Sequence, residues 1–264
     1  MSSHGVPSRK VPQDQEAFLA HLRSRLTSVE KAPHPGRWRG RDYDDPPAAP
    51  PGVEPAAGET DRLIDRFSRE LSAVGGKATL VSNPEDLKIF LQALTGSRNV
   101  RTAVRDSHPW WFDPSCSLDA RLPERHARTG WLQALEDCGL EVVAADASRD
   151  TVAAADIGIT WADWGIAETG SLVLLSGEGR SRVASLLPPV HVALLPAHRI
   201  AATRAQVFAR LREHFPPPAW PANAVLVTGP SRTADIENDL SIGVHGPAEV
   251  HVLIVSPPGV AEND

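Results

Sequence analysis

Glu168, Thr169 and Gly170 place a carboxylate, a hydroxyl and a glycine just ahead of an unbroken apolar run at residues 172–175. An apolar run of this kind predicts a strand covered on both faces, as in a parallel sheet. A carboxylate at the end of such a strand can lie at the lip of a pocket and take part in its chemistry. It can equally accept backbone N–H groups and serve the structure alone. The sequence leaves both interpretations of Glu168 open.

A second polar set follows a predicted strand directly, in the segment 228–237 (Thr-Gly-Pro-Ser-Arg-Thr-Ala-Asp-Ile-Glu). Gly229, Ser231, Arg232 and Thr233 could present backbone amides, hydroxyls and a guanidinium to a carboxylate or a phosphate. The segment is not a nucleotide-binding P-loop, because the Gly-Lys-Ser/Thr ending is missing. Alternatively, a hydroxyl of this segment caps a helix whose first turn is acidic.

Three further stretches of the chain carry polar side chains that could have a functional or a structural role. His245 lies in a glycine-flanked turn, residues 243–247, where it could act as a general base, orient a carbonyl or make a structural hydrogen bond. Arg180 and Arg182 belong to a glycine-containing loop that is suited either to clamp a charged ligand or to turn a hairpin. His191 begins an apolar strand and is expected to be a core residue.

Motifs for metal hydrolysis, calcium binding, conventional nicotinamide binding and serine hydrolysis are absent from the sequence. Cys116 and Cys138 are its two cysteines, too few to hold an iron–sulfur cluster through four thiolates or a zinc ion through cysteines alone. They could form one disulfide or remain reduced thiols. We therefore expect no metal site and no cofactor in this chain.

The elements that position these residues alternate between strands and helices, which predicts an α/β fold with a mostly parallel sheet flanked by helices. One predicted helix has Thr60 as its N-cap, and another, over residues 204–215, is expected to bury Phe208. The aromatic stretch 108–112 is expected to cover a sheet edge or to line a pocket. The main predicted strands are 78–81, 100–104, 140–144, 157–160, 172–175, 190–195, 225–228 and 250–255.

Four regions follow from the composition along the chain. Residues 1–31 contain an amphipathic helix, and residues 32–58 form a proline-rich segment that serves as a docking strap or as a disordered linker. Residues 59–256 form the main domain, and 257–264 a tail. The N-terminus lacks the apolar core of a signal peptide, and no apolar run approaches the roughly 20 residues of a membrane span, so we expect a cytoplasmic protein.

The charge balance bears on possible partners. The formal net charge is −6, and the 27 basic residues are spread along the 264-residue chain. Nucleic-acid-binding proteins concentrate basic residues in a stripe that neutralises phosphates. We therefore do not expect a nucleic acid as a partner.

Four motifs, in this order along the chain, resemble the LUD-domain family and most closely its lactate-utilization protein C branch. They are residues 162–174, Leu187-Pro-Pro-Val-His191, residues 229–237 and Gly243-Val-His-Gly-Pro247. The resemblance covers roughly residues 59–256. It implies the fold of the superfamily that contains glucosamine-phosphate isomerase, ribose-phosphate isomerase and the CoA-transferases. It also implies a three-component system that oxidises L-lactate to pyruvate, in which the partner subunits carry the iron–sulfur clusters.

Three hypotheses about function follow from this resemblance. In the first, the chain binds a small carboxylate: Arg232 holds the carboxylate, His245 accepts the hydroxyl proton, and Glu168 orients the site, with Thr169 and Gly170 beside it. In the second, Glu168 is the nucleophile of an acyl transfer, because CoA-transferases use a glutamate followed closely by glycine. In the third, the chain is a non-catalytic subunit that assembles partners or senses a metabolite.

Overall fold

The computed structural model describes residues 58–96, 100–108, 111, 125–177, 180–215, 220–234 and 240–256. The predicted N-terminal helix, the proline-rich segment up to residue 57 and the tail 257–264 lie outside the described residues.

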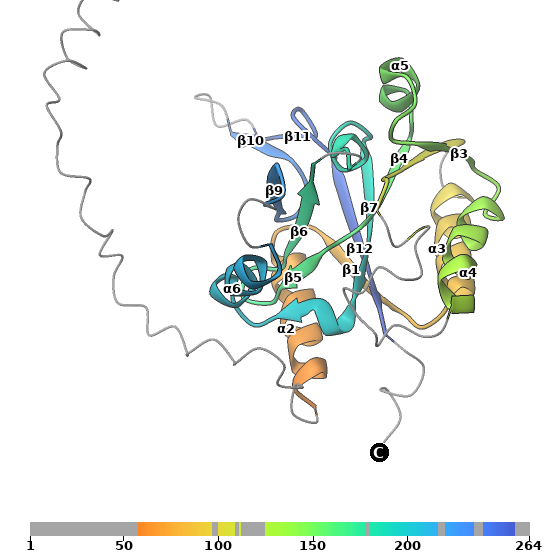
Figure 1. Ribbon diagram of the computed structural model, residues 1–264. Coiled ribbons are helices and arrows are strands. Elements are labelled where there is room, and N and C mark those ends of the chain that lie inside the picture. The colour runs from red at the N-terminus through yellow and green to blue at the C-terminus, as the bar shows by residue number, and fades with distance from the viewer. Residues whose placement is uncertain are drawn as a thin grey trace, which may run out of the picture. The chain divides into compact units, whose positions relative to one another are not determined.

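A six-stranded parallel sheet forms the centre of the main domain (Figure 1). Each pair of neighbouring strands is parallel, which confirms the predicted α/β class. In their order across the sheet, the strands are β1 (Lys77–Val81), β12 (Glu249–Val255), β7 (Val190–Pro196), β4 (Ile157–Trp161), β2 (Thr102–Arg105) and β3 (Glu141–Ala144).

The order of these strands creates a switch point between β2 and β4. From β2 the chain runs outward to β3, whereas the next strand, β4, pairs on the other side of β2 and is followed by β7 and β12. The connections on the two sides of this point therefore lead in opposite directions. In open α/β sheets, ligands bind at such a point, outside the carboxyl ends of the strands.

Two helices, α3 (Pro84–Gly96) and α4 (Arg125–Glu136), cover one face of the sheet (Figure 1). Leu87, Leu91 and Leu94 recur at helical spacing on α3 and are buried against the sheet. The Asn83 side chain accepts a hydrogen bond from the Asp86 amide at 3.1 Å and so caps the N-terminus of α3. The Trp161 ring, at the end of β4, is contacted edge-on by the rings of Trp111 and Trp131.

The opposite face is covered by α2 (Glu59–Ala73) and by a second, four-stranded sheet in the order β8-β5-β6-β9. Its strands are β8 (Ile200–Ala201), β5 (Trp164–Ile166), β6 (Ser171–Ser176) and β9 (Asn223–Val227). Helix α6 (Arg204–His214) packs on the outer side of this second sheet through Val207 and Leu211. Short elements complete the domain: α5 (Arg149–Ala153), the 3-10 turns Val183–Ser185 and Ala197–Arg199, and a hairpin of β10 (Arg232–Ala234) and β11 (Leu240–Ile242).

The prediction that residues 172–175 belong to the parallel sheet is wrong. The strand β6 is buried as expected, but it pairs antiparallel with both β5 and β9 in the smaller sheet. Its burial has a different cause: one face lies against the parallel sheet and the other against α6. Burial on both faces therefore does not distinguish a parallel strand from an antiparallel one that lies between two layers.

Three local predictions are also wrong. Gly58, with φ of 78°, precedes α2 as its N-cap, so Thr60 lies inside the helix. Phe208 is 40% exposed, because Val207 and Leu211 already supply the buried stripe of α6. Residues 232–234 form the strand β10, so neither Ser231 nor Thr233 caps a helix at that point.

Candidate functional site

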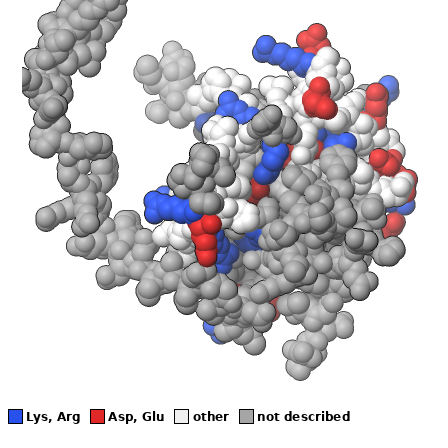
Figure 2. Space-filling view, viewed as in Figure 1, with Lys and Arg blue, Asp and Glu red and all other residues white. Residues whose placement is uncertain are grey.

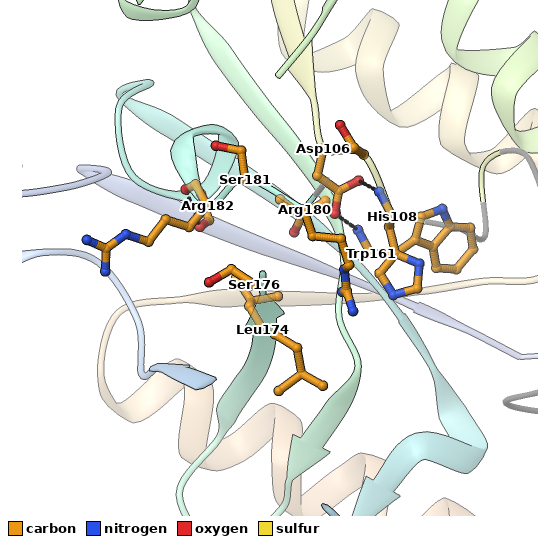
Figure 3. Close-up of a pocket in the computed structure, with 12 residues that line it drawn as sticks. Asp106, His108, Trp161, Leu174, Ser176, Arg180, Ser181 and Arg182 are labelled. Atoms are coloured by element: carbon orange, nitrogen blue, oxygen red, sulfur yellow. Dashed lines mark hydrogen bonds between the residues drawn. The ribbon is translucent and has the colours of Figure 1, made fainter. Parts of the chain in front are cut away.

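A cavity opens at the switch point, at the carboxyl ends of β2 and β4 (Figure 3). The space between its lining residues amounts to about 330 Å³, open solvent included. One wall is the loop that leaves β2, the floor is the end of β4, and the remaining walls come from the end of β6 and the segment 180–185. The lining residues are Asp106, Ser107, His108, Thr160, Trp161, Leu174, Leu175, Ser176, Arg180, Ser181, Arg182 and Ser185.

Asp163 lies behind this cavity as a buried, ionised carboxylate. Its Oδ2 accepts a hydrogen bond from the Leu175 amide at 2.8 Å, and Arg180 Nη2 lies 3.1 and 3.0 Å from its two oxygens. His108 Nε2 lies 3.4 Å from Asp163 Oδ1. Burial alone would raise the pKa of Asp163, but the hydrogen bond and charge of His108, together with Arg180, lower this pKa below its ordinary value.

Asp106 is a second buried carboxyl group, and its pKa shifts in the opposite direction. Its Oδ1 accepts hydrogen bonds from the Trp111 indole at 2.6 Å and from the His108 amide at 3.4 Å, and its Oδ2 accepts one from the Trp161 amide at 3.1 Å. Burial raises the pKa of Asp106, and the charge of His108 and these hydrogen bonds offset the shift only in part. Carboxyl groups whose pKa values move apart in one pocket are typical of functional sites.

Below the cavity, Thr160 is joined to His191. The Thr160 hydroxyl lies 2.9 Å from His191 Nε2, whereas His191 Nδ1 has no hydrogen-bond partner among the described residues. Burial, followed by the charge of His251, lowers the pKa of His191 to about 4, so the imidazole is neutral at pH 7. His191 is a core residue, as its place in the sequence predicted, with one of its two nitrogens bonded.

The structure places Glu168 at the other end of β5 from Asp163. Asp163 precedes β5 and Glu168 follows it, close to the turn into β6. Glu168 Oε1 accepts hydrogen bonds from the Arg204 amide at 2.8 Å and from Arg204 Nε at 3.0 Å. Arg204 is the first residue of α6, so the carboxylate interacts favourably with the N-terminus of that helix.

Thr169 and Gly170 lie in the same turn as Glu168. A chain of hydroxyls links Thr169 to Ser171 and Ser171 to Thr228, with 2.7 Å between the oxygens of each pair. Gly170 has φ of 60°, and a Cβ atom there would lie 2.2 Å from the Leu71 amide nitrogen. The turn therefore needs glycine because α2 passes directly against it.

The remaining predicted residues lie near one another but away from the cavity. Gly229, with φ of 77°, packs against Val74, which directly follows α2, and the exposed Arg232 reaches towards Gly75, just beyond the end of the same helix. Ser231 donates its amide to Pro247 and accepts a hydrogen bond from the Gly243 amide. These bonds tie β10, with Thr233, to the turn that carries His245, whose side chain is exposed.

Glu168, Arg232 and His245 thus share no hydrogen bond or ion pair in the part of the chain that the structure describes. The hydroxyls of Thr169, Ser171 and Thr228 connect the turn of Glu168 to the start of the segment 228–237. The three predicted functional groups themselves are not brought together. The roles predicted for them remain predictions.

Comparison with known proteins gives the family. The family model described as the LUD domain matches residues 64–255. The chain belongs to the LUD domain family. Its parallel sheet, the second sheet and the cavity all lie within the matched residues.

Several lactate utilization C proteins are similar to parts of this LUD domain protein. That of Halalkalibacterium halodurans is 41% identical over 102 residues, which cover 38% of this chain and 44% of the relative. That of Anoxybacillus flavithermus is 35% identical over 136 residues, 50% of this chain and 60% of the relative. The matched region therefore spans about half the length of these relatives.

A solved structure, that of a DUF162 family protein from Deinococcus radiodurans, is also similar to this chain. It matches with a TM-score of 0.46 at 21% sequence identity, and the match covers 75% of this chain and 98% of that one.

Sequence reasoning missed the two buried aspartates of the LUD domain. Asp106 directly follows β2, and Asp163 comes two residues after the end of β4. Polar residues at the carboxyl ends of neighbouring parallel strands were the signal that could have found them. Of the two alternatives for the loop with Arg180, the hairpin turn agrees with the backbone hydrogen bonds that Gly177 and Arg180 exchange, and the clamp for a charged ligand stays a prediction.

Within the described ranges, no group of three or more His, Cys, Asp or Glu side chains is placed to hold a metal ion. Among the helices that the structure describes, none is long and apolar enough to cross a bilayer.

Proposed function

We propose that this LUD domain protein is a subunit of a system that oxidises L-lactate to pyruvate together with iron–sulfur subunits. The observation that carries the proposal is the match of the LUD domain model over residues 64–255, combined with 35–41% identity to lactate utilization C proteins. Only this shared region supports the assignment, because the match covers about half of those relatives.

The chemistry requires an electron acceptor that this chain does not encode. Oxidation of lactate to pyruvate removes two electrons and two protons from the substrate, and one of the protons leaves the hydroxyl group. The two cysteines of the chain are too few for a cluster with four thiolate ligands. In the proposed system, the electrons pass to clusters in the partner subunits, and the protons pass to bases and then to solvent.

Two other functions remain weaker proposals. Acyl transfer through Glu168 needs a carboxylate that can attack a thioester, and Glu168 Oε1 is already bonded twice to Arg204. A non-catalytic assembly subunit would use exposed side chains such as Arg232 and His245 to contact partners. Neither alternative has an observation in its favour as specific as the family match.

The proposed function can be tested by deletion and reconstitution. We expect loss of growth on L-lactate, but not on pyruvate, when the gene is deleted, and recovery when the full chain is supplied. Lactate oxidation should appear in vitro only when the purified chain is combined with the cluster-bearing proteins that co-purify with it. Unimpaired growth of the deletion strain on lactate, or lactate oxidation by the chain alone, would refute the proposal.

A further inference from the structure

The geometry points to the cavity at the carboxyl ends of β2 and β4 as a binding site for a small organic carboxylate, held by the guanidinium of Arg180. This inference rests on the proposed function for the choice of probes, L-lactate and pyruvate. The site differs from the one that the sequence predicted around Arg232 and His245.

Some N–H donors of Arg180 are available to a ligand. Its two contacts with Asp163, at 3.1 and 3.0 Å, both come from Nη2. Among the described residues, Nη1 and Nε make no hydrogen bond. The Arg180 side chain lines the cavity (Figure 3) and keeps 22% of its surface exposed. A guanidinium with free N–H groups can donate two parallel hydrogen bonds to a carboxylate.

The guanidinium is also held in place before any ligand arrives. Asp163 has a side chain that is 2% exposed and is fixed by the Leu175 amide and by His108. Because Asp163 orients Arg180, little side-chain entropy is lost when an anion binds. Asp163 is therefore a positioning residue, whereas Arg180 is the residue that contacts the ligand.

The other lining groups suit a ligand with oxygen atoms. Ser107 and Ser176 make no side-chain hydrogen bond within the described ranges, and both line the cavity. Ser185 is already used, since its hydroxyl donates to the Arg182 carbonyl. Free hydroxyls can donate to a carboxylate or bond to a hydroxyl or keto group beside it.

The charges favour a ligand with a single negative charge. The positive charge of Arg180 is matched by Asp163, so Arg182 is the unpaired cation among the described lining residues. Its side chain extends away from the Asp106 and His108 pair (Figure 3). A doubly charged phosphate would meet the buried negative charge of Asp163 with only this one distant cation to offset it.

The loop at this position also lacks the features of a phosphate site. Phosphate sites at the ends of parallel strands use glycine-rich turns, whose backbone amides surround the anion. Here the residues that follow β2 are Asp106, Ser107 and His108, and the amide of His108 is already bonded to Asp106. The His108 amide is thus not available to the ligand.

Calorimetric titration of the purified full-length chain tests this inference. Pyruvate and L-lactate are the probes, and inorganic phosphate and acetate serve as comparison anions. We expect saturable binding of pyruvate or L-lactate at least about 10-fold tighter than that of phosphate. If neither probe binds saturably, or if phosphate binds more tightly than both, the assigned ligand class is wrong.

Three arginine-to-lysine variants locate the binding site. Arg180→Lys keeps a cation beside Asp163 but removes the planar edge with two parallel N–H donors that matches a carboxylate, so binding should weaken at least about 10-fold. Arg210→Lys, the same change at an exposed position on α6, should leave affinity within about two-fold. A loss in Arg232→Lys with none in Arg180→Lys would place the ligand at the site predicted from sequence and overturn the inference.

A measurement on the unmodified chain covers the case in which Arg180→Lys does not fold. Phenylglyoxal modifies accessible arginines, and mass spectrometry can follow Arg180 and Arg210 separately. Saturating pyruvate should slow the modification of Arg180 at least about five-fold without affecting Arg210, because a bound carboxylate covers the free guanidinium edge. Equal rates with and without pyruvate would overturn the inference.

The growth test separates this inference from the proposed function. Binding that depends on Arg180, in a chain that cannot restore growth on lactate to the deletion strain, would support the site and reject the lactate role. Full restoration of growth by an Arg180→Lys chain that folds normally would support the lactate role and reject the site.

Discussion

Asp106 and Asp163 contact the same buried histidine, and their pKa values shift in opposite directions. The amide of His108 donates to Asp106, and its Nε2 faces Asp163. Arg180 is an additional cation beside Asp163. Asp106 accepts its hydrogen bonds from neutral groups, which are the Trp111 indole and the backbone amides of His108 and Trp161. One carboxyl group of the cavity therefore favours its charged form and the other its neutral form, and this difference can be measured.

Asp163→Asn should destabilise the protein by about 3 kcal/mol at pH 7, because Arg180 loses its buried partner. The lowered pKa of Asp163 means that its contribution is present above the ordinary value of 3.8 and is lost as pH falls through the lower, folded-state pKa. The free energies of unfolding of wild type and variant, measured in urea, should therefore show the full difference at pH 7 and become equal only below about pH 3.8. The exposed Asp146→Asn, as a control, should change stability by less than about 0.5 kcal/mol.

Asp106→Asn should show the opposite pH dependence. The raised pKa of Asp106 means that its protonated form adds stability at low pH, which is lost as pH rises from 3.8 through the raised value. An asparagine keeps one acceptor oxygen and gives up one hydrogen bond, at a cost of about 1 kcal/mol. Urea unfolding between pH 4 and pH 7 should show this cost shrinking as pH rises. A cost that grows with pH would contradict the assigned direction.

His191→Gln should reduce the loss of stability in mild acid. Because the pKa of His191 is lowered from 6.5 to about 4, the neutral imidazole adds stability that disappears as pH falls from 6.5 towards 4. The full effect is roughly 3 kcal/mol, from about 1.4 kcal/mol for each pH unit. Glutamine keeps a group that can bond to Thr160 but does not titrate. Between pH 7 and pH 4 the free energy of unfolding of wild type should therefore fall more steeply than that of the variant. Equal slopes would show that His191 does not titrate in this way.

Glu168→Gln separates a structural role from a catalytic one. If Glu168 mainly holds the N-terminus of α6, glutamine keeps the acceptor oxygen and costs less than about 1 kcal/mol, with lactate oxidation retained in the reconstituted system. Glu213→Gln, an exposed substitution on α6, is the control. Loss of turnover with unchanged stability would instead support the predicted catalytic role. Hydroxylamine-sensitive labelling of Glu168 by an acyl-CoA would favour acyl transfer.

The parallel sheet was predictable because each of its strands is a short apolar run followed by a helix or a turn signal. The second sheet was not, because β6 contains an unbroken apolar run, residues 172–175, like the run 192–195 of β7, although its partners run antiparallel. Periodicity reports burial, and the two strands are equally buried. The sequence carries no signal for the layer to which each belongs.

The cavity illustrates a second limit. His108 and Asp163 are 55 residues apart, as are Asp106 and Trp161, and the strand order alone brings these residues together. Glu168, Arg232 and His245 each stand within two residues of a glycine or proline in a short motif, which is a pattern visible in the sequence. Residues that sit singly at the ends of separate strands make no local pattern, so their proximity becomes visible only once β2 and β4 are known to be neighbours.

The hydrogen bond from the Leu175 amide to Asp163 makes this amide proton a natural reporter of the cavity. The proton of a strand residue is bonded here to a side-chain carboxylate, at 2.8 Å, and the same carboxylate holds Arg180. Its rate of exchange with deuterated solvent should therefore depend on the state of the Asp163–Arg180 pair. A ligand that reaches Arg180 from the cavity mouth should be detectable as slower exchange at Leu175, from within the interior of the protein.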